Sequence, residues 1–164
     1  MATPTTTPKL IRDQWISVIT SLSPTTQAAT TFRLAVGDVP FRVWSEENPQ
    51  ACFRRFDIED RTDRVDPSLA VSNKDIELAP MSAELVVAYP HAMSKYGTNG
   101  YRDLRDMMRA DGDRIRNAIG INGGANYVSG QCLCSASYGY ERGDKASYLV
   151  MELEAEYYFD VSTA

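Results

Sequence analysis

The stretch Tyr148–Phe159, YLVMELEAEYYF, decides the class of fold because its side chains alternate in character. Apolar residues occupy every second position, and the positions between them hold three glutamates and then a tyrosine. The two sets are Met151, Leu153, Ala155 and Tyr157, and Glu152, Glu154, Glu156 and Tyr158. Successive side chains of a strand point to opposite faces of a sheet. The stretch therefore predicts a strand with one face on the core and one acidic face turned outward.

A second strand candidate, Tyr127–Tyr140, lies just before this stretch in the sequence. The turn ERGDK, which contains Gly143, separates it from the full run Ala146–Phe159. Two strand-like runs joined by a short glycine-containing turn are typical of a hairpin. We therefore expect the chain to end in an antiparallel β-hairpin.

Two segments have the spacing of amphipathic helices. From about Asn99 to Ile119, apolar residues recur every three or four positions on one side, and the other side is charged. Residues 8 to 22 repeat the pattern, with Pro8 in the first turn and Pro24 after the end. Gly120 is the expected stop of the longer helix. The apolar residues are Ile11, Trp15, Val18, Ile19 and Leu22 in the first helix, and Tyr101, Leu104, Met108, Ile115, Ala118 and Ile119 in the second.

Between the two helices, the spacing favours strands. The segments TTFRLAV (30–36), FRVW (41–44) and ACFRRFDI (51–58) are rich in β-favouring residues and are separated by turn signals. Residues 59–80 are dense in charge and predict a long loop, and Ser82–Tyr89 resumes as a strand that Pro90 closes.

These elements predict an α+β fold, with a mainly antiparallel sheet, two helices packed on one of its faces, and a C-terminal β-hairpin. A chain of 164 residues has the length of one domain, so residues 1–164 are expected to form a single domain. The first seven residues, rich in threonine and proline, are expected to be a flexible tail.

Composition narrows the class of function. The chain has 17 basic and 22 acidic residues, and the resulting net charge of −5 argues against a protein that mainly grips phosphate backbones or anionic lipid. No apolar run reaches the length of a membrane span, and the start MATPTTTPK lacks the features of a signal peptide, so we expect no membrane and a cytosolic location by default. Thirteen of the basic residues are arginines, which favours a protein that assembles with others.

Motifs of catalysis and cofactor binding are absent from the sequence. It contains no G-x-G-x-x-G, P-loop, G-x-S-x-G or H-E-x-x-H pattern. His91, the one histidine, follows Pro90 and is expected to be a turn residue and not a catalyst, since the sequence shows no obvious partner for it. Cys52, Cys132 and Cys134 are too few for a disulfide framework and are expected to be reduced and packed. We therefore expect no catalytic, cofactor or metal site, and no enzyme.

The candidate functional residues are charged. Three carboxylates on one strand face repel one another unless the face stays wet or cations lie nearby. Arg54 and Arg55 are adjacent on a predicted strand, so at least one of them is expected to be exposed. A subunit interface and the lining of a channel both remain open for this set: Arg54, Arg55, Glu152, Glu154 and Glu156.

The order of elements resembles a known family. The segments that carry the resemblance are LIRDQWISVITSL (10–22), AELVVAYP (83–90), YRDLRDMMRADGDRIRNAIG (101–120), QCLCSASYGYE (131–141) and ASYLVMELEAEYYF (146–159). In layout and in the closing strand, they are similar to the tail terminator proteins of long-tailed bacteriophages. The resemblance covers most of the chain and is weakest over 59–80.

The resemblance implies a structural virion protein of the tail and neck. Such proteins form a homo-oligomeric ring, commonly a hexamer, that caps the tail tube and joins it to the head. The implied partners are the tail tube protein and the head-to-tail connector proteins, and DNA passes through the ring without specific binding. Two alternatives remain: a small enzyme or ligand-binding domain with a pocket between sheet and helices, or another phage connector or tail-tube component.

Overall fold

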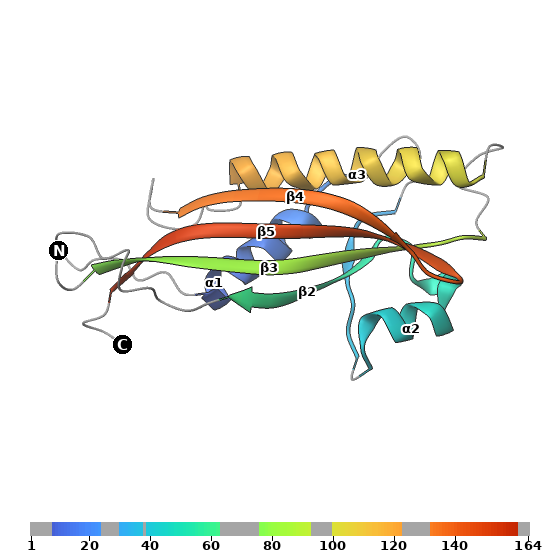
Figure 1. Ribbon diagram of the computed structural model, residues 1–164, viewed down its shortest axis with the longest axis horizontal. Coiled ribbons are helices and arrows are strands. Elements are labelled where there is room, and N and C mark those ends of the chain that lie inside the picture. Colours follow the sequence, from blue (N-terminus) through green and yellow to red (C-terminus); the bar gives the residue numbers. More distant parts are fainter. Residues whose placement is uncertain are drawn as a thin grey trace.

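The computed structural model describes residues 8–23, 30–37, 39–62, 76–92, 100–122 and 132–160. Their core is a five-stranded sheet with the strand order β1-β2-β3-β5-β4 (Figure 1). The strands are β1 (Arg33–Leu34), β2 (Arg55–Thr62), β3 (Ile76–Pro90), β4 (Cys132–Arg142) and β5 (Ala146–Asp160). Every pairing is antiparallel except that of β1 with β2. The expected α+β class and mainly antiparallel sheet are confirmed.

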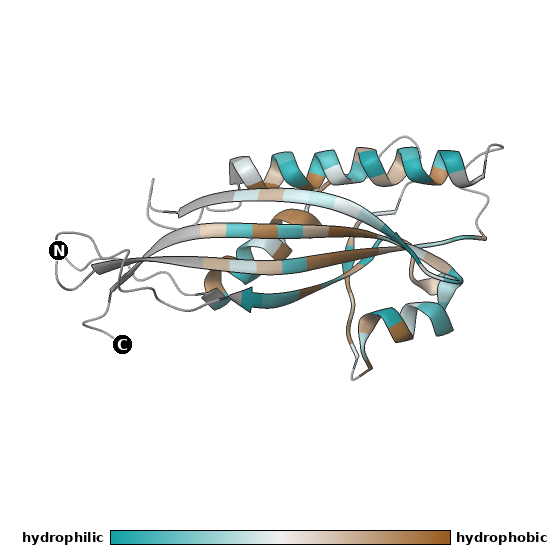
Figure 2. Ribbon diagram, in the orientation of Figure 1, coloured by the Kyte–Doolittle hydropathy of each residue, from teal (hydrophilic) through white to brown (hydrophobic). Residues whose placement is uncertain are grey.

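Two long central strands organise the sheet. β3 and β5 pair without interruption from Ile76 opposite Asp160 to Pro90 opposite Ala146. β4 and β5 form the expected hairpin, in which Arg142 lies opposite Ser147. In the middle of β5, hydrophobic and hydrophilic residues alternate (Figure 2), because one sheet face contacts the main core and the other is exposed there. Near the β4–β5 turn, both faces of β3 and β5 hold buried apolar residues, because a second buried cluster lies on the other face.

Helices α1 (Pro8–Thr20) and α3 (Tyr101–Asn122) pack on the same face of the sheet, which we call the inner face. Trp15 of α1 and Met108 of α3 share a buried cluster with Leu85 of β3 and Met151 of β5. This confirms the expected packing of both helices on one face. The longer helix does not stop at Gly120, since its helical backbone continues to Asn122.

The segment FRVW is helical, so the predicted strand there is wrong. It begins α2 (Phe41–Glu47), a third helix that packs on the opposite, outer face near the β4–β5 turn (Figure 1). Phe41 and Ser45 are buried one helical turn apart. Four residues are too short a run for periodicity to separate helix from strand. A short 3₁₀ helix, η1 (Pro49–Ala51), follows α2.

The other strand predictions need correction at their ends. Within TTFRLAV, only Arg33 and Leu34 are in a strand. In ACFRRFDI, β2 begins at Arg55, because the backbone of Arg54 is left-handed with a φ of 55°. A residue with that φ cannot continue an extended strand.

Much of the predicted loop 59–80 is sheet. β2 extends to Thr62 and β3 begins at Ile76, while residues 63–75 lie outside the described residues. Two charged residues of β2 have partners, one on each face of the sheet. Asp60 accepts a hydrogen bond from Arg12 of α1 at 2.6 Å, and Arg61 pairs with Glu84 of β3 at 2.9 Å. Charge density alone therefore misled the prediction. The predicted tail 1–7 also lies outside the described residues. No described helix is both long enough and apolar enough to cross a membrane.

Candidate assembly surface

The outer face of the sheet gathers acidic side chains from three strands. In the register of the sheet, Glu59 of β2 lies opposite Glu84 of β3, and Glu84 lies opposite Glu152 of β5. We call these three residues the acidic row. Neighbouring strands are about 4.8 Å apart, so three carboxylates directly across from one another repel. Glu154 is the next outward residue along β5 and lies opposite Ser82.

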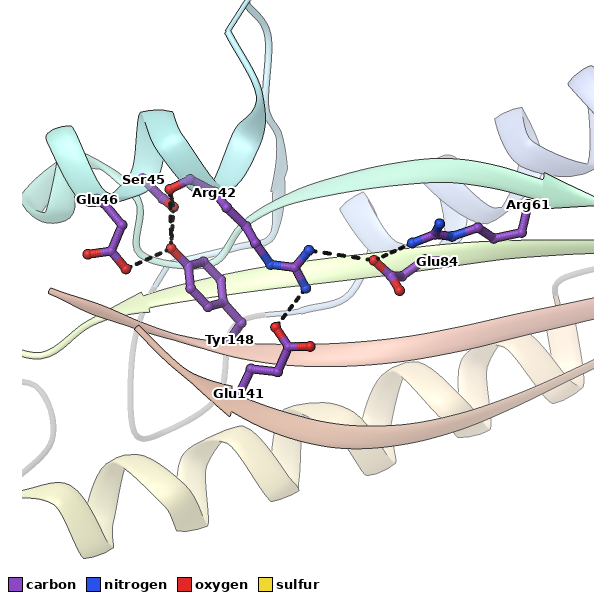
Figure 3. Close-up of polar contacts among 7 residues, drawn as sticks. All are labelled: Arg42, Ser45, Glu46, Arg61, Glu84, Glu141 and Tyr148. Carbon is purple, nitrogen blue, oxygen red and sulfur yellow. Dashed lines mark hydrogen bonds and ion pairs between the residues drawn. The ribbon is translucent and has the colours of Figure 1, made fainter. Parts of the chain in front are cut away.

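Two arginines neutralise the middle of the acidic row. Arg61 lies 2.9 Å from the Glu84 carboxylate, and Arg42 of α2 lies 3.8 Å from it (Figure 3). Arg42 also donates a hydrogen bond to Glu141 of β4 at 2.8 Å. Arg42 therefore connects α2 to two strands across the outer face.

A tyrosine anchors α2 and so positions Arg42. The Tyr148 hydroxyl of β5 donates to Glu46 at 3.0 Å and lies 2.7 Å from the Ser45 hydroxyl (Figure 3). The Arg42 guanidinium stacks over the Tyr148 ring, 5.7 Å from its centroid. Burial, with the Glu46 carboxylate beside it, raises the pKa of Tyr148 to about 12. The phenol is therefore neutral at ordinary pH and can act as a hydrogen-bond donor to α2.

The rest of the acidic surface is not neutralised by the chain itself. Within the described residues, Glu59, Glu152 and Glu154 form no ion pair, and all three are exposed. A groove of about 610 Å³ crosses this region, and its lining includes Glu84, Glu152, Ser137 and Gly139. Because β4 contributes serine and glycine here, the groove has room for side chains of a partner.

A second groove of about 370 Å³ lies beside α2 on the same face. Its lining includes Phe41, Arg42, Asp57 and Glu59. Burial raises the pKa of Asp57 above its usual range. Both grooves lie on the outer face, because Glu84 of the acidic row lines each of them. They are away from the inner face that α1 and α3 cover.

The structure separates the predicted site residues. Glu152 and Glu154 are exposed on the outer face, as expected from the alternation in β5. Glu156 lies in β5 opposite Pro80 and Leu133, and its side chain is outside the described part. Arg55 is half-buried with its guanidinium 5.9 Å from the Trp44 ring centroid, so it belongs to the contact between α2 and the sheet.

Arg54 is not a surface residue, and its assignment as an interface or channel candidate is wrong. Its side chain is fully buried and forms a two-pronged ion pair with Asp111 of α3, with N···O distances of 2.9 and 2.8 Å. Asp111 also accepts a hydrogen bond from Tyr89 of β3 at 2.7 Å. The guanidinium donates to the Thr30 carbonyl and stacks on Phe32 and Phe53.

Sequence reasoning missed this buried pair because its members are 57 positions apart. One signal was present. Asp111 falls at the spacing of Met108 and Ile115, which places a carboxylate in the middle of the apolar stripe of the helix. A charge in that position requires a buried cation, since an unpaired charge in a core is strongly unfavourable.

His91 has a partner that is not obvious from the sequence. One ring nitrogen lies 2.9 Å from the Ser147 hydroxyl and the other 3.2 Å from the Asp144 carbonyl. A hydroxyl beside an imidazole can be a nucleophile and its base. Ser147, however, is only 1% exposed, so this contact joins the end of β3 to the hairpin turn and leaves no space for a substrate.

Cys52 is buried, in agreement with the predicted packing role. Its thiol donates to the Pro49 carbonyl at 3.0 Å, and burial raises its pKa to about 12. The side chains of Cys132 and Cys134 lie outside the described part of the chain. Among the described residues, no three histidine, cysteine or acidic side chains cluster closely enough to hold a metal ion.

Neither protein-family models nor curated protein sequences give a match to this chain. Its function therefore has to be inferred from its own residues and their arrangement.

Proposed function

We propose that this protein is a ring-forming tail terminator of a long-tailed bacteriophage, a structural virion protein that caps the tail tube and joins it to the head. The observation that carries the proposal is the exposed acidic surface on the part of the outer sheet face that α2 leaves uncovered, in a chain whose order of elements resembles that family. A carboxylate face that has too few cations of its own is suited to a wet channel or to a neighbouring subunit.

The proposal assigns the protein no reaction. Its partners are other copies of the chain, which form a ring of six. The tail tube protein and the head-to-tail connector proteins are its further partners. DNA passes through the ring without specific binding. The net charge of −5 supports this role, because a negative ring does not retain a passing phosphate backbone.

The test is removal of the gene from the phage that carries it. Lysates without the protein should contain headless tails of uncontrolled length, and wild-type protein supplied from a plasmid should restore tails of one length joined to heads. Electron microscopy measures both. Tails of normal length joined to heads in the absence of the protein would contradict the proposal.

A further inference from the structure

Four exposed arginines lie along one flank of α3. They are Arg102, Arg105, Arg109 and Arg116, and we call them the arginine stripe. Their spacing of three, four and seven residues keeps them on one side of a helix with 3.6 residues per turn. Gly112, which falls between them in this pattern, packs against Tyr138 of β4. The arginine stripe therefore borders β4, which is an edge strand of the sheet.

Aromatic rings of β4 hold part of this stripe in place. The Arg105 guanidinium lies 4.5 Å from the centroid of Tyr140, and that of Arg116 lies 5.8 Å from the centroid of Tyr138. Arg116 also pairs with Asp113 at 3.2 Å. Within the described residues, Arg102, Arg105 and Arg109 form no ion pair with a carboxylate.

The chain thus carries two charged surfaces of opposite sign and similar dimensions. From Arg102 to Arg109 the helix rises about 10 Å. The acidic row of Glu59, Glu84 and Glu152 spans three neighbouring strands, which is also about 10 Å. Among the described residues, Glu59, Glu152 and Glu154 form no ion pair. Arg102, Arg105 and Arg109 form none either, and Arg109 has Tyr140 and Asp106 as its electrostatic neighbours.

The two surfaces cannot satisfy each other within one molecule. α3 covers the inner face of the sheet, and the acidic row lies on the outer face. A head-to-tail contact places the arginine stripe of one copy on the outer face of the next, and such contacts form rings when the rotation closes.

We infer that the arginine stripe of one copy binds the acidic row and Glu154 on the outer face of the next copy. This inference deepens the proposed function, because it names the subunit contact of the proposed ring. The groove lined by Ser137 and Gly139 receives the arginine side chains. Duplex DNA would also attract arginines, whereas a second copy supplies exposed carboxylates over the same span of about 10 Å.

Reciprocal charge reversal tests the contact. The helix variant, Arg105→Glu with Arg109→Glu, reverses two charges of the arginine stripe. The sheet variant, Glu152→Arg with Glu154→Arg, reverses two charges of the acidic surface. Each double variant alone should associate on the order of 100-fold more weakly than wild type, because like charges then face each other. An equimolar mixture should assemble again, because an alternating ring has opposite charges at every contact. Sedimentation velocity at low salt, about 0.02 M, measures the assembly, and about 0.5 M salt should weaken it.

Control variants separate the contact from net charge. Lys9→Glu with Arg33→Glu and the helix variant both take the formal net charge from −5 to −9, because each reversal changes it by two. Glu47→Arg with Asp144→Arg and the sheet variant both take it to −1. The control sites are exposed and lie outside both surfaces. The controls should associate as wild type does. If the helix variant fails to fold, Arg105→Gln with Arg109→Gln replaces it and should also weaken assembly.

Several results would overturn the inference. Wild-type protein that stays monomeric at low salt would do so, as would reversal variants that assemble normally or mixtures that fail to recover. Loss of binding to a duplex DNA fragment in the helix variant, with assembly unchanged, would reassign the stripe to DNA. Reciprocal rescue in a protein whose absence leaves tails normal would retain the contact and refute the proposed function. Rings that still form after charge reversal, in a phage whose tails grow to uncontrolled length without the protein, would refute the contact and retain the proposed function.

Discussion

Arg54 contributes to stability from inside the protein. Its guanidinium and the Asp111 carboxylate are both fully buried. Removing Arg54 takes away the two-pronged partner of Asp111 and leaves only the longer ion-pair contact of 3.7 Å to the partly exposed Arg114 among the described residues. We expect Arg54→Ala to lower the free energy of unfolding by about 3–5 kcal/mol, measured by urea denaturation. Arg55→Ala is the matched control and should cost below about 1 kcal/mol, because among the described residues the Arg55 guanidinium stacks on Trp44 and forms no ion pair. Equal effects of the two substitutions would contradict the buried pair.

The buried phenol of Tyr148 predicts a dependence of stability on pH. Its pKa rises from 10.0 to about 12 in the folded chain, so the folded state keeps a proton that the unfolded state loses. The stabilisation is complete below pH 10 and is lost as the pH rises toward 12. The difference in unfolding free energy between wild type and Tyr148→Phe should therefore shrink between those two pH values. Parallel pH profiles would show that Tyr148 is not protected from ionisation.

At the scale of elements, two glycines of α3 test how this helix meets the sheet. A Cβ at Gly112 would lie 3.1 Å from the Tyr138 ring, whereas one at Gly120 would meet no atom within 4 Å. Alanine favours a helix over glycine by about 0.5–1 kcal/mol. Gly120→Ala should gain this amount in thermal or urea unfolding, and Gly112→Ala should gain less or lose stability. Equal gains would mean that α3 does not pack closely on β4.

At the scale of the whole molecule, the sheet separates a large core from a small one. Trp15 belongs to the inner cluster, and Phe41 belongs to the smaller cluster that α2 forms with Tyr148. Phe41→Ala should raise hydrogen exchange mainly in α2, because a short element can open alone. Trp15→Ala should raise exchange throughout β3 and β5. Loss of protection in the central strands by as much in Phe41→Ala as in Trp15→Ala would contradict this separation.

Long periodic patterns are sufficient to predict β5 and α3 from the amino-acid sequence. The alternation from Met151 to Ala155 specifies which β5 side chains are buried, and it correctly places Glu152 and Glu154 on the outside. The apolar stripe of α3 likewise specifies its buried side. These patterns suffice because the same spacing of apolar residues recurs over many positions, and each recurrence strengthens the prediction of which side is buried.

The conformation of the short segments and the burial of the charged ones depend on contacts with elements that are distant in the sequence. FRVW is helical because Phe41 packs on the outer face, and nothing within four residues encodes that contact. Arg54 can be buried because Asp111 of α3, 57 positions away in the sequence, supplies its counter-charge. The partners of Glu84 come from α2 and β2, which the sheet brings together. A charge is stable in a core or on a sheet only where another element supplies its counter-charge, and that is a property of the assembled fold.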